Sequence, residues 1–222
     1  MTFHIITIFP ESIKSYFESS ILKRAQKNKK IKIKFYNPRD YTKDKHKTVD
    51  EKQFGGGPGM VMRVDVIVRA VLSVLNEIKK STRTKVIILS PIGRQFDQKM
   101  AQKWPQKYKD IIFICGHYEG IDARLKKIIK NLKLKIENLS IGPYVLTGGE
   151  LPSAIIVDAI SRQIPGVLGK IESLEENRGL GIPVYTRPEI FMHKGKKYKV
   201  PKVLLSGHHK NIEEWRKKNQ KS

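Results

Sequence analysis

The chain has 222 residues, 39% of them hydrophobic and 8% aromatic, which is typical of a globular protein with a substantial core. Lysine and arginine total 44 against 21 acidic residues, a formal net charge of +23 that favours a nucleic-acid partner; a solvated lysine-rich surface is the alternative interpretation. One cysteine, Cys115, excludes a disulfide framework and a multi-cysteine metal site. No apolar run is long enough to span a bilayer, and the N-terminus does not resemble a signal peptide, so we expect a cytoplasmic protein without a membrane partner.

Strand and helix patterns alternate from the first residues onward. A buried strand is predicted at 3–9, and a helix at 11–27, where apolar residues recur at helical spacing. The alternating segment 31–36 predicts a strand with one solvent-exposed face. Residues 38–63 are polar, glycine-rich and too long for a plain connection, which indicates a functional loop.

The same alternation continues to about residue 163. The predicted elements are helices at 64–79, 95–104, 121–131 and 151–163, strands at 86–90, 111–115 and 133–137, and an irregular loop at 138–150. This order predicts an α/β fold with a mostly parallel sheet and helices on both faces.

The composition changes after Ile164. We expect residues 1–163 to form the α/β domain and 164–183, rich in glycine, proline and charge, to form a linker. Residues 184–222 are very basic and too short for an independent core, so they are expected to form a small C-terminal domain that folds against another part of the protein.

A run of four glycines and one proline, GGGPGM, occupies 55–60 and follows a basic segment, 39–54. Glycine permits backbone conformations that other residues resist, so a turn is the simplest interpretation. A basic loop beside bare backbone also suits a phosphate or a base. The run is neither a P-loop nor a dinucleotide-binding motif, because the flanking residues of both are absent.

Three further segments each follow an apolar strand and precede a predicted helix: LSPIGR (89–94), CGHYEGID (115–122) and SIGPYVLTGGE (140–150). In an open α/β sheet the ligand crevice lies at the carboxyl ends of the strands. Together the three segments therefore predict a crevice that offers backbone groups to an adenine or a ribose.

Some polar residues have a structural and a functional interpretation. Glu119 and Asp122 are placed either to cap a helix or to act in the site, and Arg162 suits the end of its helix as well as a site. The adjacent His208 and His209 lack supporting ligands and do not predict a metal site.

The order of the motifs YNPRDYT, GGGPGMVM, LSPIGR, CGHYEGID, SIGPYVLTGGELP, YTRPE and VPKVLLSGHH resembles that of the bacterial tRNA (guanine-N1)-methyltransferase family, from residue 1 to about residue 216. The resemblance implies a SPOUT-type α/β fold with a deep C-terminal trefoil knot and a small, mostly helical C-terminal domain, here short compared with the family. It also implies a homodimer whose subunits share each active site, and methylation by S-adenosyl-L-methionine (AdoMet) of N1 of guanosine 37 in tRNA.

The resemblance assigns roles to residues of this chain. It places Arg162 at the guanine and Glu119 near the base or a magnesium ion, and it implies no metal ligands of the protein's own. The implied AdoMet-binding residues are Leu89, Ser90, Pro91, Gly93, Gly116, Tyr118, Gly120, Ile141, Gly142, Pro143, Tyr144, Val145, Leu146, Gly148 and Gly149. The implied RNA-binding residues are Arg39, His46, Gly56, Gly57, Gly59, Arg187, Ser206, His208 and Arg216.

One residue of the family's pattern is missing. N1 of guanine carries a proton at neutral pH, so methylation needs a base, and the family's aspartate for this role is replaced by Gly181. A glutamate of the linker (Glu172, Glu175 or Glu176) is one substitute, and proton loss to water or His117 is another. A catalytically impaired tRNA-binding protein is the third explanation.

Two more departures fall in the predicted crevice. His117 replaces the family's arginine, and Pro143 replaces an aspartate, which removes a charge and a backbone N–H. A ribosomal-RNA enzyme is disfavoured by the GGGPGM and YTRP segments, and a purely structural basic protein would need none of these loops.

Overall fold

The computed structural model describes residues 1–78, 83–169 and 181–220. The chain divides into two compact units, Met1–Leu168 and Gly169–Ser222. Within the described residues no helix is long and apolar enough to cross a membrane.

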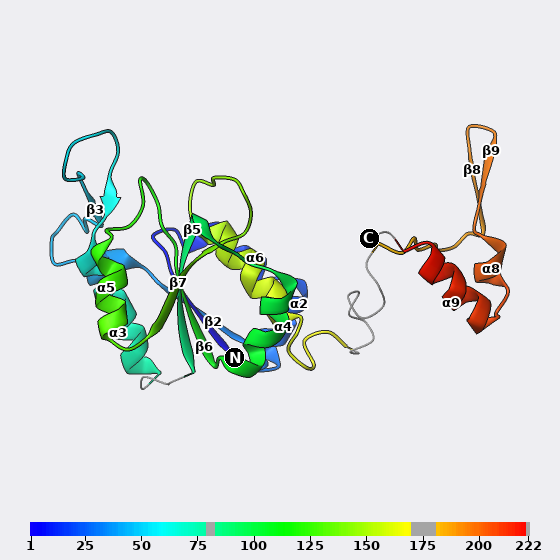
Figure 1. Cartoon of the computed structure of the whole chain (residues 1–222), viewed down its shortest axis with the longest axis horizontal. Helices are drawn as coiled ribbons and strands as arrows, with labels where there is room; N and C mark the ends of the chain where they lie inside the picture. The colour runs from blue at the N-terminus through cyan, green and yellow to red at the C-terminus, as the bar shows by residue number, and fades with distance from the viewer. Residues whose placement is uncertain (79–82, 170–180, 221–222) are drawn as a thin grey trace. The chain divides into compact units, whose positions relative to one another are not determined.

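A five-stranded sheet forms the centre of the first unit (Figure 1). Its strands are β1 (Thr2–Ile6), β2 (Lys32–Tyr36), β5 (Thr84–Gln95), β6 (Asp110–Ile114) and β7 (Lys135–Ser140), in the order β2-β1-β6-β5-β7. All the pairings in this sheet are parallel. The α/β class and the parallel sheet predicted from the sequence are confirmed.

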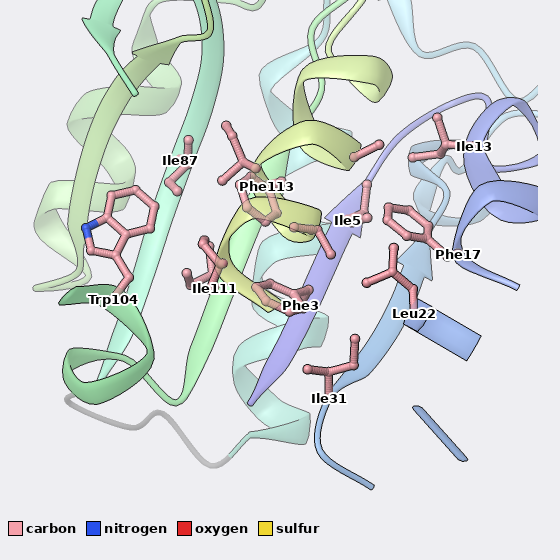
Figure 2. Packing of buried hydrophobic residues seen from close by; sticks show 14 of the residues in the cluster. Phe3, Ile5, Ile13, Phe17, Leu22, Ile31, Ile87, Trp104, Ile111 and Phe113 are labelled. Carbon is pink, nitrogen blue, oxygen red and sulfur yellow. The ribbon is translucent and has the colours of Figure 1, made fainter. Parts of the chain in front are cut away.

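Helices cover both faces of the sheet (Figure 1). On one face lie α3 (Val64–Glu77) and α5 (Arg124–Asn131); on the other lie α1 (Glu11–Phe17), α2 (Ser20–Lys27), α4 (Gln98–Lys107) and α6 (Glu150–Ser161). Successive side chains of a strand point to opposite faces, so the strands contribute side chains to two hydrophobic cores, one on each face of the sheet. Phe3, Ile111 and Phe113 pack under α4 and α6 (Figure 2), whereas Ile112 and Ile114 pack under α3 and α5.

The central position of β6 in the sheet explains why its sequence is continuously apolar after Asp110. Every residue of β6 is buried, because strands flank it on both edges and helices on both faces. The edge strand β2 has no fully buried residue, in agreement with its alternating basic pattern.

The prediction of one helix over 11–27 is wrong. Two helices, α1 and α2, are separated at Glu18 and Ser19, and Ser20 has a positive φ of 43°. The Ser19 hydroxyl donates to the Tyr16 carbonyl, a local hydrogen bond that competes with a continuing helix. Each short helix buries its own apolar residues, so the helical spacing in the sequence did not reveal the break.

Other predicted boundaries shift by a few residues. Helix α4 begins at Gln98 rather than 95, because the Asp97 carboxylate accepts the N–H of Met100 and caps the helix there. Strand β5 continues to Gln95, so LSPIGR lies within a strand rather than between a strand and a helix. The predicted functional loop 38–63 contains the short 3-10 helix η1 (Pro38–Tyr41) and the paired strands β3 (Asp50–Glu51) and β4 (Val61–Met62).

The second unit contains a hairpin that the sequence analysis did not predict. Strands β8 (Ile190–His193) and β9 (Lys196–Lys199) are joined by Lys194 and Gly195, both with positive φ, and are followed by helices α8 (Lys202–Leu205) and α9 (His209–Lys218). A two-residue turn of this kind matches the twist of a hairpin. None of the residues 181–220 is buried, so this part of the second unit has no core of its own.

Candidate active site

The three glycine- and proline-rich segments of the first unit meet at one end of the sheet. Residues from all three line a cavity of about 570 Å³ at the carboxyl ends of β5, β6 and β7. This volume lies in the range of small-molecule sites. The wall combines exposed apolar side chains such as Ile92 and Leu146 with glycine backbone, so it offers both a surface for a flat ring and polar backbone groups.

Most of the residues expected to hold the cofactor lie in the wall of this cavity. They are Leu89, Ser90, Pro91, Gly116, Tyr118, Gly120, Ile141, Tyr144, Val145, Leu146, Gly148 and Gly149. Gly93, Gly142 and Pro143 belong to the same segments but are outside the wall. His117, Asp122, Lys126 and Thr147 also line the cavity.

The first segment is an outward excursion of strand β5. Leu89 and Arg94 both pair with Leu139 of β7, and the four residues between them leave the ladder. A Cβ on Gly93 would lie 2.5 Å from the Leu139 nitrogen and 2.6 Å from the Asn138 carbonyl carbon. Only glycine permits so close an approach of the two backbones, so Gly93 closes the excursion without lining the cavity.

The third segment reaches the second at its glycines. The N–H of Gly149 donates to the Gly116 carbonyl at 3.1 Å, and a Cβ on Gly149 would lie 2.6 Å from the Cys115 Cα. This contact fixes the start of α6 against the end of β6. Burial raises the pKa of the Cys115 thiol well above its usual value, and the nearby Glu150 carboxylate raises it further, so this cysteine stays a neutral core residue.

A buried carboxylate lies directly behind the second segment. Nε2 of His117 is 2.7 Å from both carboxylate oxygens of Glu150, and the Thr7 hydroxyl also donates to Glu150. The Glu150 side chain is 8% exposed and that of His117 13%. Glu150 and Thr7 were missed in the sequence analysis; the only signal for Glu150 was its place after the TGG turn.

His117 separates the main cavity from a second one. The second cavity, of about 530 Å³, is lined by Phe9, Ser12, Ile13, His117, Leu146, Thr147, Gly148, Glu150 and Leu151. Gly148 leaves room for the imidazole, since a Cβ there would lie 2.4 Å from its Cε1 atom. The histidine is therefore built into the wall that the two cavities share.

The glycine run 55–60 lies against the second segment. The N–H of Glu119 donates to the Met60 carbonyl, and the N–H of Met62 to the Gly120 carbonyl. A Cβ on Gly59, which has a φ of 82°, would lie 2.5 Å from a Glu119 carboxylate oxygen. Gly59 thus lies against Glu119, a residue of the cavity wall, although Gly56, Gly57 and Gly59 are all exposed and outside the wall itself.

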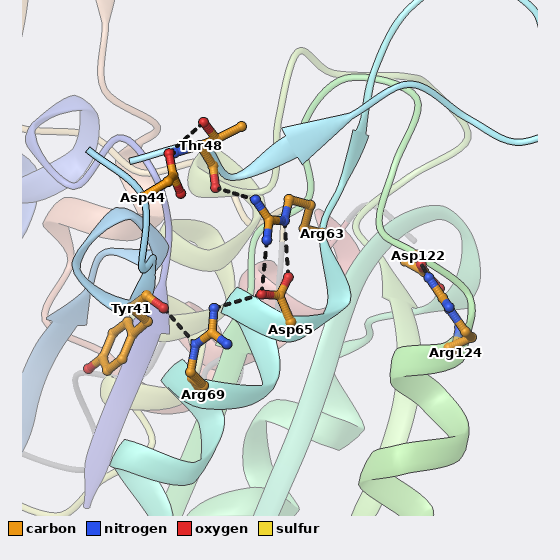
Figure 3. Close-up of polar contacts among 8 residues, drawn as sticks. All are labelled: Tyr41, Asp44, Thr48, Arg63, Asp65, Arg69, Asp122 and Arg124. Carbon is orange, nitrogen blue, oxygen red and sulfur yellow. Dashed lines mark hydrogen bonds and ion pairs between the residues drawn. The ribbon is translucent and has the colours of Figure 1, made fainter. Parts of the chain in front are cut away.

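Two arginines hold the basic loop that precedes the glycine run (Figure 3). Arg63 donates to the Thr48 carbonyl, Arg69 to the Tyr41 carbonyl, and both pair with Asp65. Burial would raise the pKa of Asp65, but the hydrogen bonds from the two arginines outweigh it and keep the pKa below its usual value. Asp65 therefore stays ionised and anchors the loop to α3.

The predicted RNA-binding residues of that loop lie on its surface. The Arg39 guanidinium donates to the Lys47 carbonyl at 3.2 Å, and His46 is exposed. Asp122 accepts the N–H of Arg124 and pairs with its guanidinium, which lowers the pKa of the Asp122 carboxyl. The structural interpretation of Asp122, at the start of α5, is thus supported.

The structure does not bring Arg162 to Glu119 within one chain. Glu119 lies in the cavity wall, near the start of α6, whereas Arg162 caps the other end of the helix. Arg162 follows Glu150 by twelve positions along the helix, which is a rise of about 18 Å.

Comparison with known proteins identifies the family of this chain. The model of the family described as tRNA (guanine-1)-methyltransferase TrmD matches residues 1–222. The chain belongs to this family. The tRNA (guanine-N(1)-)-methyltransferase of Dictyoglomus turgidum is 49% identical over 218 residues, 96% of this chain and 82% of that protein. Proteins of the same name from Clostridioides difficile (47% identical, 98% of this chain, 91% of that protein) and Carboxydothermus hydrogenoformans (46%, 98% and 82%) are similar to it as well.

Membership of the TrmD family gives no support to the explanation of a catalytically impaired binder. The residue at the position of the missing aspartate, Gly181, has a φ of 74°, a conformation that favours glycine. Glu172, Glu175 and Glu176, the candidate substitute bases of the linker, lie outside the described residues.

The remaining predicted RNA-binding residues of this TrmD-family chain lie in the second unit. Arg187, Ser206, His208 and Arg216 are exposed, and the Ser206 hydroxyl accepts the N–H of His208. In the part of the chain that the structure describes, no group of three or more His, Cys, Asp and Glu side chains could hold a metal ion, and His208 and His209 acquire no further ligand.

Proposed function

We propose that this protein transfers the methyl group of AdoMet to N1 of guanosine 37 in tRNA, the nucleotide beside the anticodon. The observation that carries the proposal is the convergence of three backbone-rich segments on one cavity, in a chain that belongs to the tRNA (guanine-1)-methyltransferase family over its whole length.

AdoMet fits the chemistry of the cavity. Exposed apolar side chains such as Ile92 and Leu146 provide a surface for the adenine, and the segments around Gly116 and Gly148 present backbone groups for its polar edge. Bound there, AdoMet supplies an electrophilic methyl group on a positively charged sulfur. Leu89 to Gly93, Gly116 to Gly120 and Ile141 to Gly149 are the segments that would hold it.

The RNA partner follows from the charge. A net charge of +23 favours a polyanion, and each phosphate contact by lysine or arginine releases counterions. We assign the tRNA surface to the basic loop with Arg39, His46 and the glycine run, and to the exposed residues of the second unit. Any effect of Mg²⁺ is expected through Glu119, whose exposed side chain is in the cavity wall.

A second copy of the chain would complete the site. Methylation places negative charge on O6 of guanine as the N1 proton leaves, and an arginine stabilises that charge. Arg162 lies at the far end of α6 from Glu119 in the same chain, which supports a homodimer whose partner supplies this group. Such a dimer shares each active site between subunits.

We further assign the first unit to the knotted SPOUT fold and the protein to the cytoplasm. The match of the tRNA (guanine-1)-methyltransferase family model over residues 1–222 supports this fold. We also retain the division into an α/β domain (1–163), a linker (164–183) and a tRNA-contacting domain (184–222).

Transfer of label from AdoMet tests the function. The purified full chain is incubated with methyl-labelled AdoMet and an unmodified tRNA transcript that carries G36 and G37, with a transcript carrying A37 as the control. Label in the first transcript alone is expected. Equal label in both transcripts, or label in neither while tRNA binds, would contradict the proposed function.

A further inference from the structure

The proposed reaction needs a group that accepts the N1 proton of guanine. Among the described residues that line the main cavity, the ionisable side chains are His117, Tyr118, Glu119, Asp122, Lys126 and Tyr144. Tyrosine and lysine hold their own protons at neutral pH and are poor acceptors. Asp122 pairs with Arg124, which lowers its pKa and weakens it as a base. His117 and Glu119 remain.

His117 differs from Glu119 in having a buried partner that orients it. Both carboxylate oxygens of Glu150 lie 2.7 Å from Nε2 of His117, and Thr7 in turn donates to Glu150 and accepts the N–H of Phe9. An imidazole held by a buried carboxylate is fixed in one tautomer, and the carboxylate stabilises the charge it acquires with a second proton. The Glu119 side chain is exposed and lies beside Gly59.

The second ring nitrogen of His117 is available. Nδ1 makes no hydrogen bond with the residues that the structure describes, and the ring lies in the wall shared by the two cavities. The Phe9 ring packs edge-on against the imidazole with centroids 5.0 Å apart and limits its rotation. With Nε2–H donated to Glu150, Nδ1 carries the lone pair.

We infer that His117 is the general base of this enzyme, that Nδ1 accepts the N1 proton of guanine, and that Glu150 is its positioning residue. The inference rests on the proposed function. In this proposal His117 takes the role of the family's aspartate, whose position is occupied here by Gly181. The base then lies three residues beyond the end of β6 rather than in the linker.

The step balances without another reactant. Nδ1 of neutral His117 takes the N1 proton, and the N1 electron pair forms a bond to the methyl carbon of AdoMet. The carbon–sulfur bond breaks with its electron pair remaining on sulfur. The products are N1-methylguanosine, the neutral thioether S-adenosylhomocysteine and an imidazolium paired with Glu150, which later loses its proton to water.

The charged and titratable groups around the imidazole set the expected pH dependence. They are Glu150 from α6, Tyr118 and Glu119 from the same segment, and the buried Cys115 at the end of β6; Thr7 and Phe9, which follow β1, are neutral. Since Glu150 is the group in contact, removal of its charge makes the protonated imidazole less stable. The acid limb of the rate profile should then move to lower pH.

Single-turnover methyl transfer, with AdoMet and G37 tRNA both saturating, tests the inference between pH 5.5 and 9. His117→Ala is expected to lower the rate by about 10²- to 10⁴-fold, the usual contribution of a general base. Added imidazole should restore part of the rate in this variant. Binding of AdoMet and tRNA should change little. His117→Gln keeps a donor for Glu150 and should show the same loss, which guards against a folding defect in the alanine variant.

Two further variants separate catalysis from structure. Glu150→Gln should shift the acid limb to lower pH, an effect that a packing role would not produce. Glu119→Gln is expected to be slower but should retain that limb in its residual activity. A His117→Ala protein with the wild-type rate, or a Glu119→Gln protein that alone loses the acid limb, would overturn the inference and leave the proposed function standing. Failure of the wild-type protein to label G37 tRNA would instead overturn the proposed function.

Discussion

The buried imidazole of His4 has a polar neighbour at each of its two ring nitrogens. Nε2 of His4 in β1 lies 3.1 Å from a carboxylate oxygen of Asp110, and its Nδ1 lies 3.0 Å from the Tyr36 hydroxyl. Tyr36 also donates to Glu77 at the end of α3. Burial lowers the pKa of His4 although Asp110 acts in the opposite direction, and burial raises the pKa of Tyr36 to about 12.

The buried His4 predicts that acid destabilises the first unit. Because the pKa of His4 is lower in the folded than in the unfolded chain, the unfolded chain binds the proton first as the pH falls below about 6.5. The free energy of unfolding should therefore fall from pH 7.5 to 5.5, and His4→Gln should show a smaller fall. Urea unfolding followed by the fluorescence of the buried Trp104 measures it, with the exposed His46→Gln as the control. The same fall in all three proteins would contradict the prediction.

The close approach of Gly93 to β7 predicts that a larger residue at this position destabilises the protein. A methyl group there would meet the backbone of β7 at about 2.5 Å, so the two strands must separate. Gly93→Ala should lower the free energy of unfolding by about 1–3 kcal/mol, as over-packing does. Gly169→Ala, where a methyl group meets nothing within 4 Å, is the matched control. An unchanged urea midpoint for Gly93→Ala would show that β5 and β7 tolerate the separation.

The sequence predicted some of these residues and missed others for a physical reason. Gly116 and Gly149 could be predicted at the crevice, because three glycine-rich segments each follow an apolar strand and the ligand crevice of an open α/β sheet lies at the carboxyl ends of its strands. The pairing of His117 with Glu150 could not, since the two residues are 33 positions apart and meet only when β6 and α6 pack together. The helical spacing of apolar residues in α6 likewise does not reveal that the carboxylate of its first residue, Glu150, is buried.

The hairpin of β8 and β9 is exposed along both strands and carries four lysines: Lys194, Lys196, Lys197 and Lys199. Cross-strand pairing places Phe191 opposite Tyr198 and His193 opposite Lys196, and both aromatic rings are more than half exposed. The sequence analysis missed this hairpin because no buried face accompanies its alternation, and a strand pattern is recognised by burial. Its lysines and rings suit a phosphate backbone and an unpaired base.

The hairpin should contribute to tRNA binding. Lys197→Ala combined with Lys199→Ala, two residues on one face of β9, should weaken the affinity for tRNA and reduce the slope of log K against log salt by about 2, one for each lost phosphate contact. Lys99→Ala with Lys103→Ala, on the exposed face of α4, is the matched control. Filter binding at several salt concentrations gives the slope. An unchanged slope in the hairpin variant would place the tRNA elsewhere.

Some features of the whole chain could be predicted from the periodicity of its sequence, and others could not. The order of strands and helices and their two-sided burial followed from periodicity, because each β strand of the first unit alternates or is continuously apolar. The knot and the homodimer were implied by resemblance alone, since neither leaves a periodic signal. The separation of Arg162 from Glu119 along α6 became visible only in the structure.

A shared active site predicts complementation between two defective subunits. Arg162→Ala and Glu119→Gln chains with different tags are co-expressed, and the mixed dimer is purified through both tags. If each site takes Arg162 from one subunit and Glu119 from the other, one site of the mixed dimer keeps both residues, and about half of the wild-type activity should return. Dimers of each variant alone serve as controls. A mixed dimer as inactive as these controls would place both residues in the same subunit's site.

The position of the transferred methyl group distinguishes N1 methylation of guanosine 37 from any other methylation of tRNA. After reaction with the wild-type protein, the G37 transcript is digested to nucleosides and to oligonucleotides that contain the anticodon, and both are analysed by mass spectrometry against N1-methylguanosine and N2-methylguanosine standards. We expect N1-methylguanosine at position 37 and no other modified nucleoside. A methyl group on another atom of guanine, or at another position of the tRNA, would contradict it.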